Sequence, residues 1–416
     1  DTIVIDHHIS DYKLPEVYSI INPNRFDEKN NYKNLAAVGV VYLFILALRK
    51  KLRSINYFNK EFKEPNLLYY LDLVALGTVC DVVSLKNYNR IFVNEGIKII
   101  HERNNKGITA IIDNSNINHS PSSTDLGYII GPQLNAASRI DDSSLSSKIL
   151  ISENLIEIES ISRKLFLLNE KRKLIEKTIY EEALILANKE KDKNILIIRG
   201  NDWHIGVLGI VASRLVEKFN KPSIVISFNN QYGIGSARSL NFIDLGNMIM
   251  LAKNEGLLIS GGGHKMAAGI KILNENYQKF VNFLDDKFKD FNSSFFKKTL
   301  DLDLILEINE VNNHLLDNIE QLEPFGNDNP EPQFILKNVS IEFSKVIKEK
   351  HIIINFKDID NNNIKGICFN SYDNELGQNL LNHSNKKYDL ACSVKKDVYQ
   401  GKIKPQLIIK DAIILN

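Results

Sequence analysis

Hydrophobic residues in the first third of the chain form short runs separated by polar stretches. The run Thr2–Ile5 is typical of a strand buried on both faces, and it ends directly at Asp6. Leu35–Leu48 carries apolar residues at helical spacing, and Leu67–Val83 is a second apolar segment. We expect strands and helices to alternate to about residue 140, which is typical of a layered α/β domain.

The pattern changes in Ser144–Lys191, where Glu, Lys, Leu and Ile recur at helical spacing without Gly or Pro. This predicts one or two long helices that join two domains. Strand patterns return at Asn194–Ile198 and Ser223–Ser227, with a helical pattern between them at Gly209–Phe219. We therefore expect a second α/β unit, which ends near residue 297.

After Pro324, short strand patterns alternate with turn residues, which predicts a small all-β module and favours a barrel. Examples are Gln333–Val339, His351–Phe356 and Gln406–Ile409. Residues 335–416 hold 13 Lys/Arg and 9 Asp/Glu, a local net charge of +4. Such a mild basic bias is compatible with a phosphate backbone as partner.

Composition narrows the class of protein. A length of 416 residues predicts two to three domains, and 44% hydrophobic with 25% charged residues is typical of globular chains. The 52 Lys/Arg balance 51 Asp/Glu, which excludes a histone-like partner of bulk nucleic acid but allows a local basic groove. Apolar runs stay well short of about 18 residues, so we expect no transmembrane helix.

The three cysteines, Cys80, Cys368 and Cys392, lie far apart and form no CxxC pair. We therefore expect neither a disulfide framework nor a structural zinc site, and a reducing cytoplasm fits best. The chain opens at Asp1, without methionine, on what reads as a buried strand. We expect further sequence to precede it.

The tripeptide Asp6-His7-His8 places a carboxylate and two imidazoles at the carboxyl end of a predicted strand, where open α/β sheets place their active sites. Asp and His suit Mn²⁺, Mg²⁺ or Zn²⁺, and oxygen-rich ligand sets favour the first two. Adjacent side chains in an extended segment point to opposite faces, so all three cannot bind one ion. From these residues alone, turn or capping roles remain an alternative.

Asp81 closes an apolar segment and has no basic neighbour in sequence until Lys86. A buried carboxylate there must be paired, hydrogen-bonded or bound to a metal. A helix or turn cap is the other interpretation.

Several further segments combine glycine with charged or hydroxyl side chains. Three glycines at Gly261–Gly263 free the backbone to approach a ligand and offer N–H groups to an anion, and His264 and Lys265 follow at once. Ser236, Arg238 and Ser239 place two hydroxyls and a guanidinium within four residues, which suits a phosphate. Gly131–Arg139 and Trp203–Val207 are two more candidates, and each segment also admits a purely structural role.

In this order the segments resemble the DHH phosphoesterase superfamily and, within it, the RecJ family of single-strand-specific exonucleases. The matching stretches span nearly the whole chain: DHH (Asp6–His8), LPEVYSIINP (Leu14–Pro23), LGTVCDVVSL (Leu76–Leu85), GPQLNAASR (Gly131–Arg139), WHIGVLGIVASRL (Trp203–Leu215), GSARS (Gly235–Ser239), GGGHKMAAG (Gly261–Gly269) and PFGNDNPEP (Pro324–Pro332).

The resemblance implies an α/β fold in four segments. A DHH-type parallel-sheet domain at 1–143, without its N-terminal part, is joined by a long helical connector at 144–191 to a smaller DHH-associated α/β domain at 192–297. A β-barrel similar to an OB-fold follows at 298–416.

The resemblance also implies a metal-dependent enzyme that degrades single-stranded DNA from its 5′ end in DNA repair and recombination. Two ions, Mn²⁺ or Mg²⁺, would activate a water and stabilise the leaving oxygen. By similarity His7 and Asp81 would be metal ligands. Asp6 and His8 would act beside them, on the ligands or the substrate phosphate, and His264 would lie over the scissile phosphate.

By the same resemblance, the substrate would be held by a set of residues from the GSARS and GGGH segments together with Arg139: Ser236, Arg238, Ser239, Gly262, Gly263 and Lys265. Arg139, Ser236 and Arg238 would hold DNA phosphates, including a 5′ phosphate. The β-barrel would extend the groove by stacking and positive charge, with Tyr399 and Lys402 as candidate contacts. Single-strand-binding protein and a helicase are the partners that the family suggests.

One departure from the family affects the expected activity. Family members carry at least three further carboxylate ligands upstream of DHH, so we expect this chain to bind metal poorly and allow that it is inactive. Two alternatives remain open: a phosphodiesterase of short oligonucleotides or cyclic dinucleotides, and a catalytically silent single-strand-binding scaffold.

Overall fold

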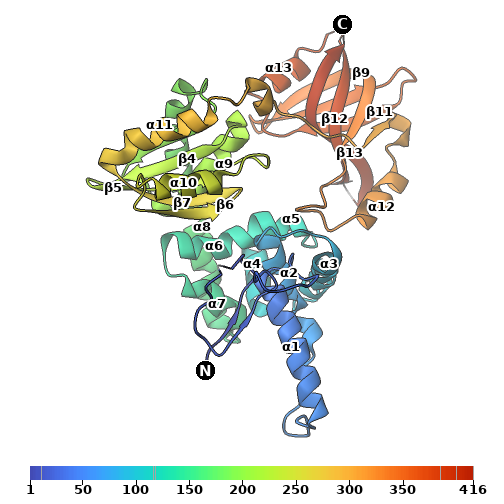
Figure 1. The fold of residues 1–416 in the computed structure, drawn as a ribbon. Coiled ribbons are helices and arrows are strands. Elements are labelled where there is room, and N and C mark those ends of the chain that lie inside the picture. The colour runs from blue at the N-terminus through green and yellow to red at the C-terminus, as the bar shows by residue number, and fades with distance from the viewer. Residues whose placement is uncertain (11, 116, 118, 385, 400, 416) are drawn as a thin grey trace. The chain divides into compact units, whose positions relative to one another are not determined.

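The chain folds into two compact units, each assembled from segments that are distant in sequence. Figure 1 labels their helices and strands. The first comprises Asp1–Asn104, Ser120–Gly127 and Leu300–Asn416, and the second comprises 105–119 and 128–299. The first unit thus joins most of the predicted DHH-type segment with the predicted barrel. The computed structural model describes residues 1–10, 12–115, 117, 119–384, 386–399 and 401–415.

The first unit begins with the strand predicted at Thr2–Ile5. Strand β1 (Ile3–Ile5) pairs in parallel with β2 (Ser19–Ile21). The remaining elements before the barrel are α1 (Ala37–Ser54), η1 (Leu67–Tyr70), α2 (Leu71–Cys80), α3 (Asn87–His101), α5 (Ser123–Asp125) and the π-helical η2 (Leu126–Ile130), which continues into the second unit. The predicted alternation of strands and helices to about residue 140 is therefore wrong.

The reason lies in how completely α2 is enclosed. Val74, Ala75 and Leu76 are all buried, so the helix has almost no polar face, and its apolar run cannot be told from a buried strand by pattern alone. A Cβ added at Gly96 of α3 would lie 2.1 Å from the backbone oxygen of Leu71. The two helices thus touch through their backbones, which fixes the direction in which α2 points.

The predicted all-β module is confirmed as a closed barrel. Its sheet runs in the order β10-β11-β13-β12-β9-β8, and an additional pairing of β10 with β9 closes it. The strands are β8 (Leu304–Leu306), β9 (Phe334–Ile347), β10 (His351–Lys357), β11 (Asn363–Cys368), β12 (Lys387–Tyr399) and β13 (Lys402–Leu415), accompanied by η6 (Ile308–Glu310), α12 (Asn313–Gln321) and α13 (Glu375–Leu381).

The second unit contains the predicted helical connector as α7 (Ser144–Ile151) and the 35-residue α8 (Leu155–Lys189). The Asn154 side chain caps α8 by accepting the N–H groups of Ile156 and Glu157. Its other helices are α4 (Lys106–Asn114), α6 (Gly131–Ile140), η3 (Ile205–Val207), α9 (Leu208–Phe219), α10 (Leu245–Asn254), η4 (Asn274–Asn276), α11 (Tyr277–Phe288) and η5 (Ser293–Phe296).

A five-stranded sheet forms the centre of this unit in the order β3-β4-β5-β7-β6. Strands β3 and β4 are parallel and the other pairs are antiparallel. Helices α10 and α11 cover one face, and α9 with the C-terminal part of α8 covers β3 and β4 on the other. The strands are β3 (Leu196–Asn201), β4 (Ser223–Phe228), β5 (Tyr232–Arg238), β6 (Ser260–His264) and β7 (Ala267–Leu273).

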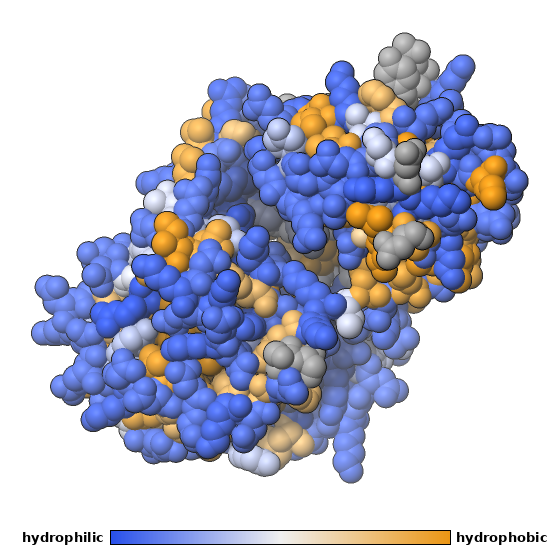
Figure 2. Space-filling view, turned by 90° about the horizontal axis from the view of Figure 1, so that it is seen from above, coloured by the Kyte–Doolittle hydropathy of each residue, from blue (hydrophilic) through white to orange (hydrophobic). Residues whose placement is uncertain are grey.

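Figure 2 shows one face of the molecule, on which hydrophilic residues predominate and hydrophobic residues form separate patches. Among the described residues, we find no helix whose length and apolar character would let it cross a membrane.

Asp72, in the first unit, is a buried residue whose ionised form is unfavourable. Its residue is only 4% exposed, and its carboxylate accepts a hydrogen bond from the N–H of Leu73. No cation of the described residues forms an ion pair with it. Burial raises the pKa of Asp72 from 3.8 to about 6, against a smaller lowering by the backbone N–H groups of Leu73 and Asp72.

We predict that Asp72→Asn stabilises the chain in a pH-dependent way. Because the folded-state pKa is raised, the charged carboxyl costs nothing below pH 3.8, its cost grows between pH 3.8 and 6, and it is complete above pH 6. The difference in the free energy of unfolding between the variant and the native chain should therefore grow by about 3 kcal/mol, in favour of the variant, between pH 3.5 and 8. Urea unfolding across this range measures it, with the exposed Asp317→Asn as control. A difference that does not change with pH would contradict the prediction.

Candidate functional site

His7 and Asp81 meet in the first unit, although 74 positions separate them. The N–H of Asp6 bonds to the oxygen of Ile21, so β1 ends here and the next residues leave the carboxyl end of the strand pair. Asp81 follows the last residue of α2. Nε2 of His7 lies 3.2 Å from Oδ2 of Asp81, and their side chains are 15% and 41% exposed. The pair thus forms a partly open site.

Asp6 and His8 form a second, more exposed pair next to the first. Nδ1 of His8 lies 2.8 Å from Oδ1 of Asp6. Partial burial acts to raise the pKa of Asp6, but the hydrogen bonds to the His8 ring and to the backbone at His7 and His8 together lower it below its ordinary value. Asp6 is therefore ionised at neutral pH and fixes the orientation of the His8 ring.

Two asparagines that the sequence analysis missed hold this loop in place. Nδ2 of Asn22 donates to the oxygen of His8 at 2.8 Å, and Nδ2 of Asn24 donates to the oxygen of His7 at 2.6 Å. Asn22 is buried. The signal was present as two amides on either side of Pro23, directly after an apolar strand, but their targets are 14 to 17 residues away and leave no local pattern.

The His7–Asp81 pair fits part of the coordination of a divalent ion. An imidazole nitrogen and a carboxylate oxygen converge, and both donor types suit Mn²⁺, while Mg²⁺ takes one or two carboxylates and keeps several waters. Within the described ranges no group of three or more His, Cys, Asp or Glu side chains is arranged so that it could hold one metal ion. The described residues thus supply two protein donors to such an ion.

The second unit presents a different surface, on the face of the sheet over β7 and β6, beside the N-terminus of α9, which packs against β5. Residues directly opposite each other on paired strands point to the same face. The register aligns Arg238 with Ala267 and His264 in one row, and Ser236 with Gly269 and Gly262 in the next. Since neighbouring strands lie roughly 5 Å apart, Arg238 and His264 stand roughly 10 Å apart across a floor of small residues.

The glycines of the GGGH segment therefore belong to an edge strand. A Cβ added at Gly262 or Gly269 would meet no atom within 4 Å, so both leave open space above the floor. A Cβ at Gly263 would lie 2.2 Å from the backbone oxygen of Ala267. Gly263 is therefore required by the tight return of β6 into β7, whereas Gly262 is free to face a ligand.

Two guanidinium groups border this floor without a carboxylate partner among the described residues. Arg139 of α6 donates to the oxygen of Gly206 at 2.9 Å, and Arg238 donates to Oγ of Ser236 at 3.1 Å and to the oxygen of Ala237 at 2.8 Å. Burial lowers the pKa of Arg238, and the positive charge of Arg139 lowers it further. Two partly buried like charges favour an anion between or beside them.

The N-terminus of α9 adds to this positive potential. A Cβ at Gly209, in its first turn, would lie 2.8 Å from Nη2 of Arg238 and 3.0 Å from Oγ of Ser236. Helix N-termini carry partial positive charge and free N–H groups, which attract phosphate. The structure thus brings together the predicted residues Arg139, Ser236 and Arg238.

The other predicted site residues are placed as follows. His264 is exposed, and its Nδ1 accepts the N–H of Met266 at 3.3 Å. Lys265 is exposed, and its oxygen accepts the N–H of Leu245. Ser239 is buried, with its hydroxyl on the oxygen of Ile243, so in this structure it serves the turn before α10. Lys402 is exposed, and the side chain of Tyr399 lies outside the described part of the chain.

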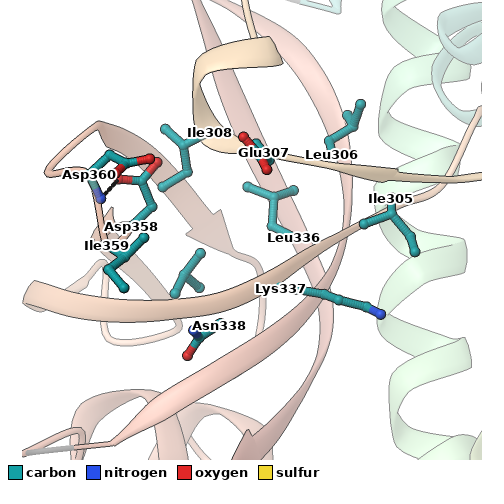
Figure 3. A pocket seen from close by; sticks show the side chains of 11 residues that line it. Ile305, Leu306, Glu307, Ile308, Leu336, Lys337, Asn338, Asp358, Ile359 and Asp360 are labelled. Atoms are coloured by element: carbon teal, nitrogen blue, oxygen red, sulfur yellow. Dashed lines mark hydrogen bonds between the residues drawn. The ribbon is translucent and has the colours of Figure 1, made fainter.

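The barrel contains a pocket of a different character (Figure 3). It has a volume of about 290 Å³ and lies among β8, η6, β9 and the loop after β10. Carboxylates of Glu307, Asp358 and Asp360 line it beside the apolar Ile308 and Leu336. Because these carboxylates repel phosphate, the pocket is a poor candidate for contact with a nucleic-acid backbone.

Two family models match segments of this chain. Residues 192–290 match the DHHA1 domain, and residues 302–411 match the RecJ OB domain. The single-stranded-DNA-specific exonuclease RecJ of Dickeya dadantii is 32% identical over 98% of this chain and 72% of its own length.

Two solved structures of RecJ from Thermus thermophilus, in complex with Mn²⁺ and with Mg²⁺, each cover 99% of this chain. Their TM-scores are 0.81 and 0.79, at 25% and 24% identity. The chain spans 58% and 59% of these two structures, less than two thirds of their length. By its likeness to the Dickeya dadantii protein over almost all of its residues, this chain belongs to the RecJ family.

Proposed function

We propose that this chain hydrolyses the phosphodiester bonds of single-stranded DNA from the 5′ end, with Mn²⁺ or Mg²⁺ as cofactor, in DNA repair and recombination. The observation that carries the proposal is the 3.2 Å approach of His7 Nε2 to Asp81 Oδ2 at the carboxyl end of a parallel strand pair. Family membership supports it, because the Dickeya dadantii relative is named a single-stranded-DNA-specific exonuclease.

The residues around His7 have separable roles in this reaction. A divalent ion supplies a bound water of lowered pKa and positive charge beside the phosphate. His7 and Asp81 would hold that ion. From the hydrogen bond we assign the ring proton of His8 to Nδ1, which donates to the ionised Asp6. Nε2 of the exposed His8 ring is then free to take or give a proton.

The second unit would bind the DNA. Arg139, Arg238 and the N-terminus of α9 offer charge-assisted hydrogen bonds to a terminal 5′ phosphate, which carries more charge than an internal one. The strand would then cross the floor of Ala267, Gly269 and Gly262 toward His264. A floor of one alanine and two glycines offers no side chain that could read a base, so it accepts any sequence, as a non-specific nuclease requires.

The OB-type barrel would extend this contact along the strand, where positive charge and stacking bind without sequence preference. Single-strand-binding protein and a helicase are the partners we propose, and the cytoplasm is the proposed location. The three free thiols, two of them buried, are compatible with a reducing compartment.

One observation favours a second candidate, binding of single-stranded DNA without cleavage. The described residues bring together two metal donors and no third. Incubation of the chain with Mn²⁺ and a 5′-phosphorylated, 3′-labelled strand separates the two candidates. Shortening from the 5′ end supports the exonuclease, and salt-sensitive binding without shortening supports the binding protein.

We predict that His7→Ala and Asp81→Asn each lower Mn²⁺ affinity at least tenfold, since each removes one of two protein donors. Any shortening of the labelled strand should fall with it, while DNA binding without metal stays within about twofold. Titration of free Mn²⁺ by electron paramagnetic resonance measures the affinity. The exposed His314→Ala, on α12, is the control. Unchanged Mn²⁺ binding in both variants would refute the metal site.

We predict that Arg238→Ala abolishes a preference for 5′-phosphorylated over 5′-hydroxyl strands. Loss of a charge-assisted hydrogen bond should weaken binding of the phosphorylated strand about 10- to 100-fold. Binding of the 5′-hydroxyl strand should change far less. Fluorescence anisotropy with both strands measures this, and Arg163→Ala on the exposed side of α8 is the control. An equal loss for both strands would place Arg238 away from the 5′ end.

We predict opposite consequences for two adjacent glycines. Gly263→Ala should lower the thermal midpoint, because its Cβ would overlap the oxygen of Ala267. Gly262→Ala should keep the native thermal midpoint, because its Cβ meets open space, yet weaken DNA binding by obstructing the floor. Calorimetry and anisotropy on both variants measure the two effects. Native DNA affinity in Gly262→Ala would show that the strand does not lie on this floor.

A further inference from the structure

The turn that carries Asp81 is held in a strained backbone conformation. Val82, the next residue, has φ +58°, in the left-handed region that β-branched residues rarely adopt. The N–H of Val82 bonds to the oxygen of Val79, so the backbone turns sharply as α2 ends. Such strain persists only where surrounding contacts determine the conformation, and it is concentrated at functional sites.

One residue from far along the chain makes the contacts that hold this turn. Nδ2 of Asn327 donates to the oxygen of Val82 at 2.8 Å, and the oxygen of Asn327 accepts the N–H of Leu85 at 2.8 Å. Asn327 thus spans the turn with its side chain at one end and its backbone at the other. A Cβ at the preceding Gly326 would lie 2.6 Å from Cδ1 of Leu85, so a larger residue there would have to displace the Leu85 side chain.

Asn327 is itself rigidly placed, in the PFGNDNPEP segment that leads from α12 to β9. Gly326 and Asn329 bond to each other through both backbone groups, and Nδ2 of Asn329 donates to the oxygens of Leu322 and Pro324. From α5, Oγ of Ser123 donates to the oxygen of Phe325. Hydrogen bonds therefore hold this segment in place on both sides of Asn327.

We propose that Asn327 is a positioning residue for the metal ligand Asp81. By fixing the oxygen of Val82, it keeps Val82 in the left-handed conformation and so orients the preceding Asp81 toward His7. The inference rests on the proposed function, since it assigns Asp81 to a metal. It also gives the segment that introduces the barrel a role in the metal site, because Asn327 of this segment bonds to the turn that directly follows Asp81.

The test uses three variants of the 416-residue chain. Asn327→Ala removes the amide donor and keeps the backbone bond to Leu85, and Asn327→Asp places an acceptor against the oxygen of Val82. In Asn327→Ala/Val82→Gly, a glycine adopts φ +58° without strain and needs no restraint. Mn²⁺ affinity is measured by electron paramagnetic resonance, and exchange of the Asp81–Leu85 amides is measured by hydrogen–deuterium exchange without metal.

We expect Asn327→Ala to lower Mn²⁺ affinity about tenfold and to speed exchange at Asp81–Leu85, with a larger loss in Asn327→Asp. Val82→Gly should restore most of the Mn²⁺ affinity in the Asn327→Ala background, while the β12 and β13 amides stay protected throughout. If Asn327→Ala keeps the native Mn²⁺ affinity, or if Val82→Gly does not restore a lost affinity, Asn327 does not position Asp81. It then only connects the helices to the barrel.

Failure of the proposed function would look different. If His7→Ala leaves Mn²⁺ binding of the chain unchanged, the metal assignment is wrong, whatever Asn327 does. Amide exchange then still decides whether Asn327 holds the Val82 turn: faster exchange at Asp81–Leu85 that Val82→Gly reverses supports the restraint, and unchanged exchange overturns it.

Discussion

The enclosure of helix α2 is the constraint on which the candidate metal site depends. Its residues are buried on nearly every side, and α3 touches its backbone at Gly96. A helix so confined cannot shift along its axis, so the backbone position of Asp81, the residue after its last turn, is fixed. Asp81 can therefore meet His7, although neither the strand nor the helix alone defines a site.

A second constraint, the period of two along β-strands, organises the proposed phosphate site. In β5 and β7 every second residue is buried against α10 and α11, so the residues between them are assigned to the opposite face. Ser236 and Arg238 must then lie on the same side as Gly269, and the register adds Gly262 and His264. A shift of one residue would bury Arg238 and expose Ala237 instead.

These two constraints explain how much could be predicted from the sequence. The barrel, the long connector and the strands β3 and β4 are locally periodic, and their patterns predicted them, whereas β5, β6 and β7 carry the glycine-rich motifs and were not predicted as strands. The helix α2 was missed because complete burial removes the polar face that reveals a helix. Asn22, Asn24 and Asn327 were missed for another reason: each donates its side-chain amide to a backbone oxygen distant in sequence, and such bonds leave no periodicity. His7 and Asp81 were predicted by resemblance, and their contact required the fold.

The arginines of the second unit differ in whether a carboxylate pairs with them, and this difference bears on the roles of Arg139 and Arg238. Arg172 of α8 is buried and donates to Glu176, which is only 2% exposed and also meets Arg214. There the chain neutralises the charge that it buries, as a structural ion pair requires. At Arg139 and Arg238 the described residues supply backbone and hydroxyl oxygens but no carboxylate. Among the described residues, one buried arginine forms an ion pair while Arg139 and Arg238 form none, which leaves room for an anion from outside, and a phosphate matches the fork of donors that two guanidinium groups present.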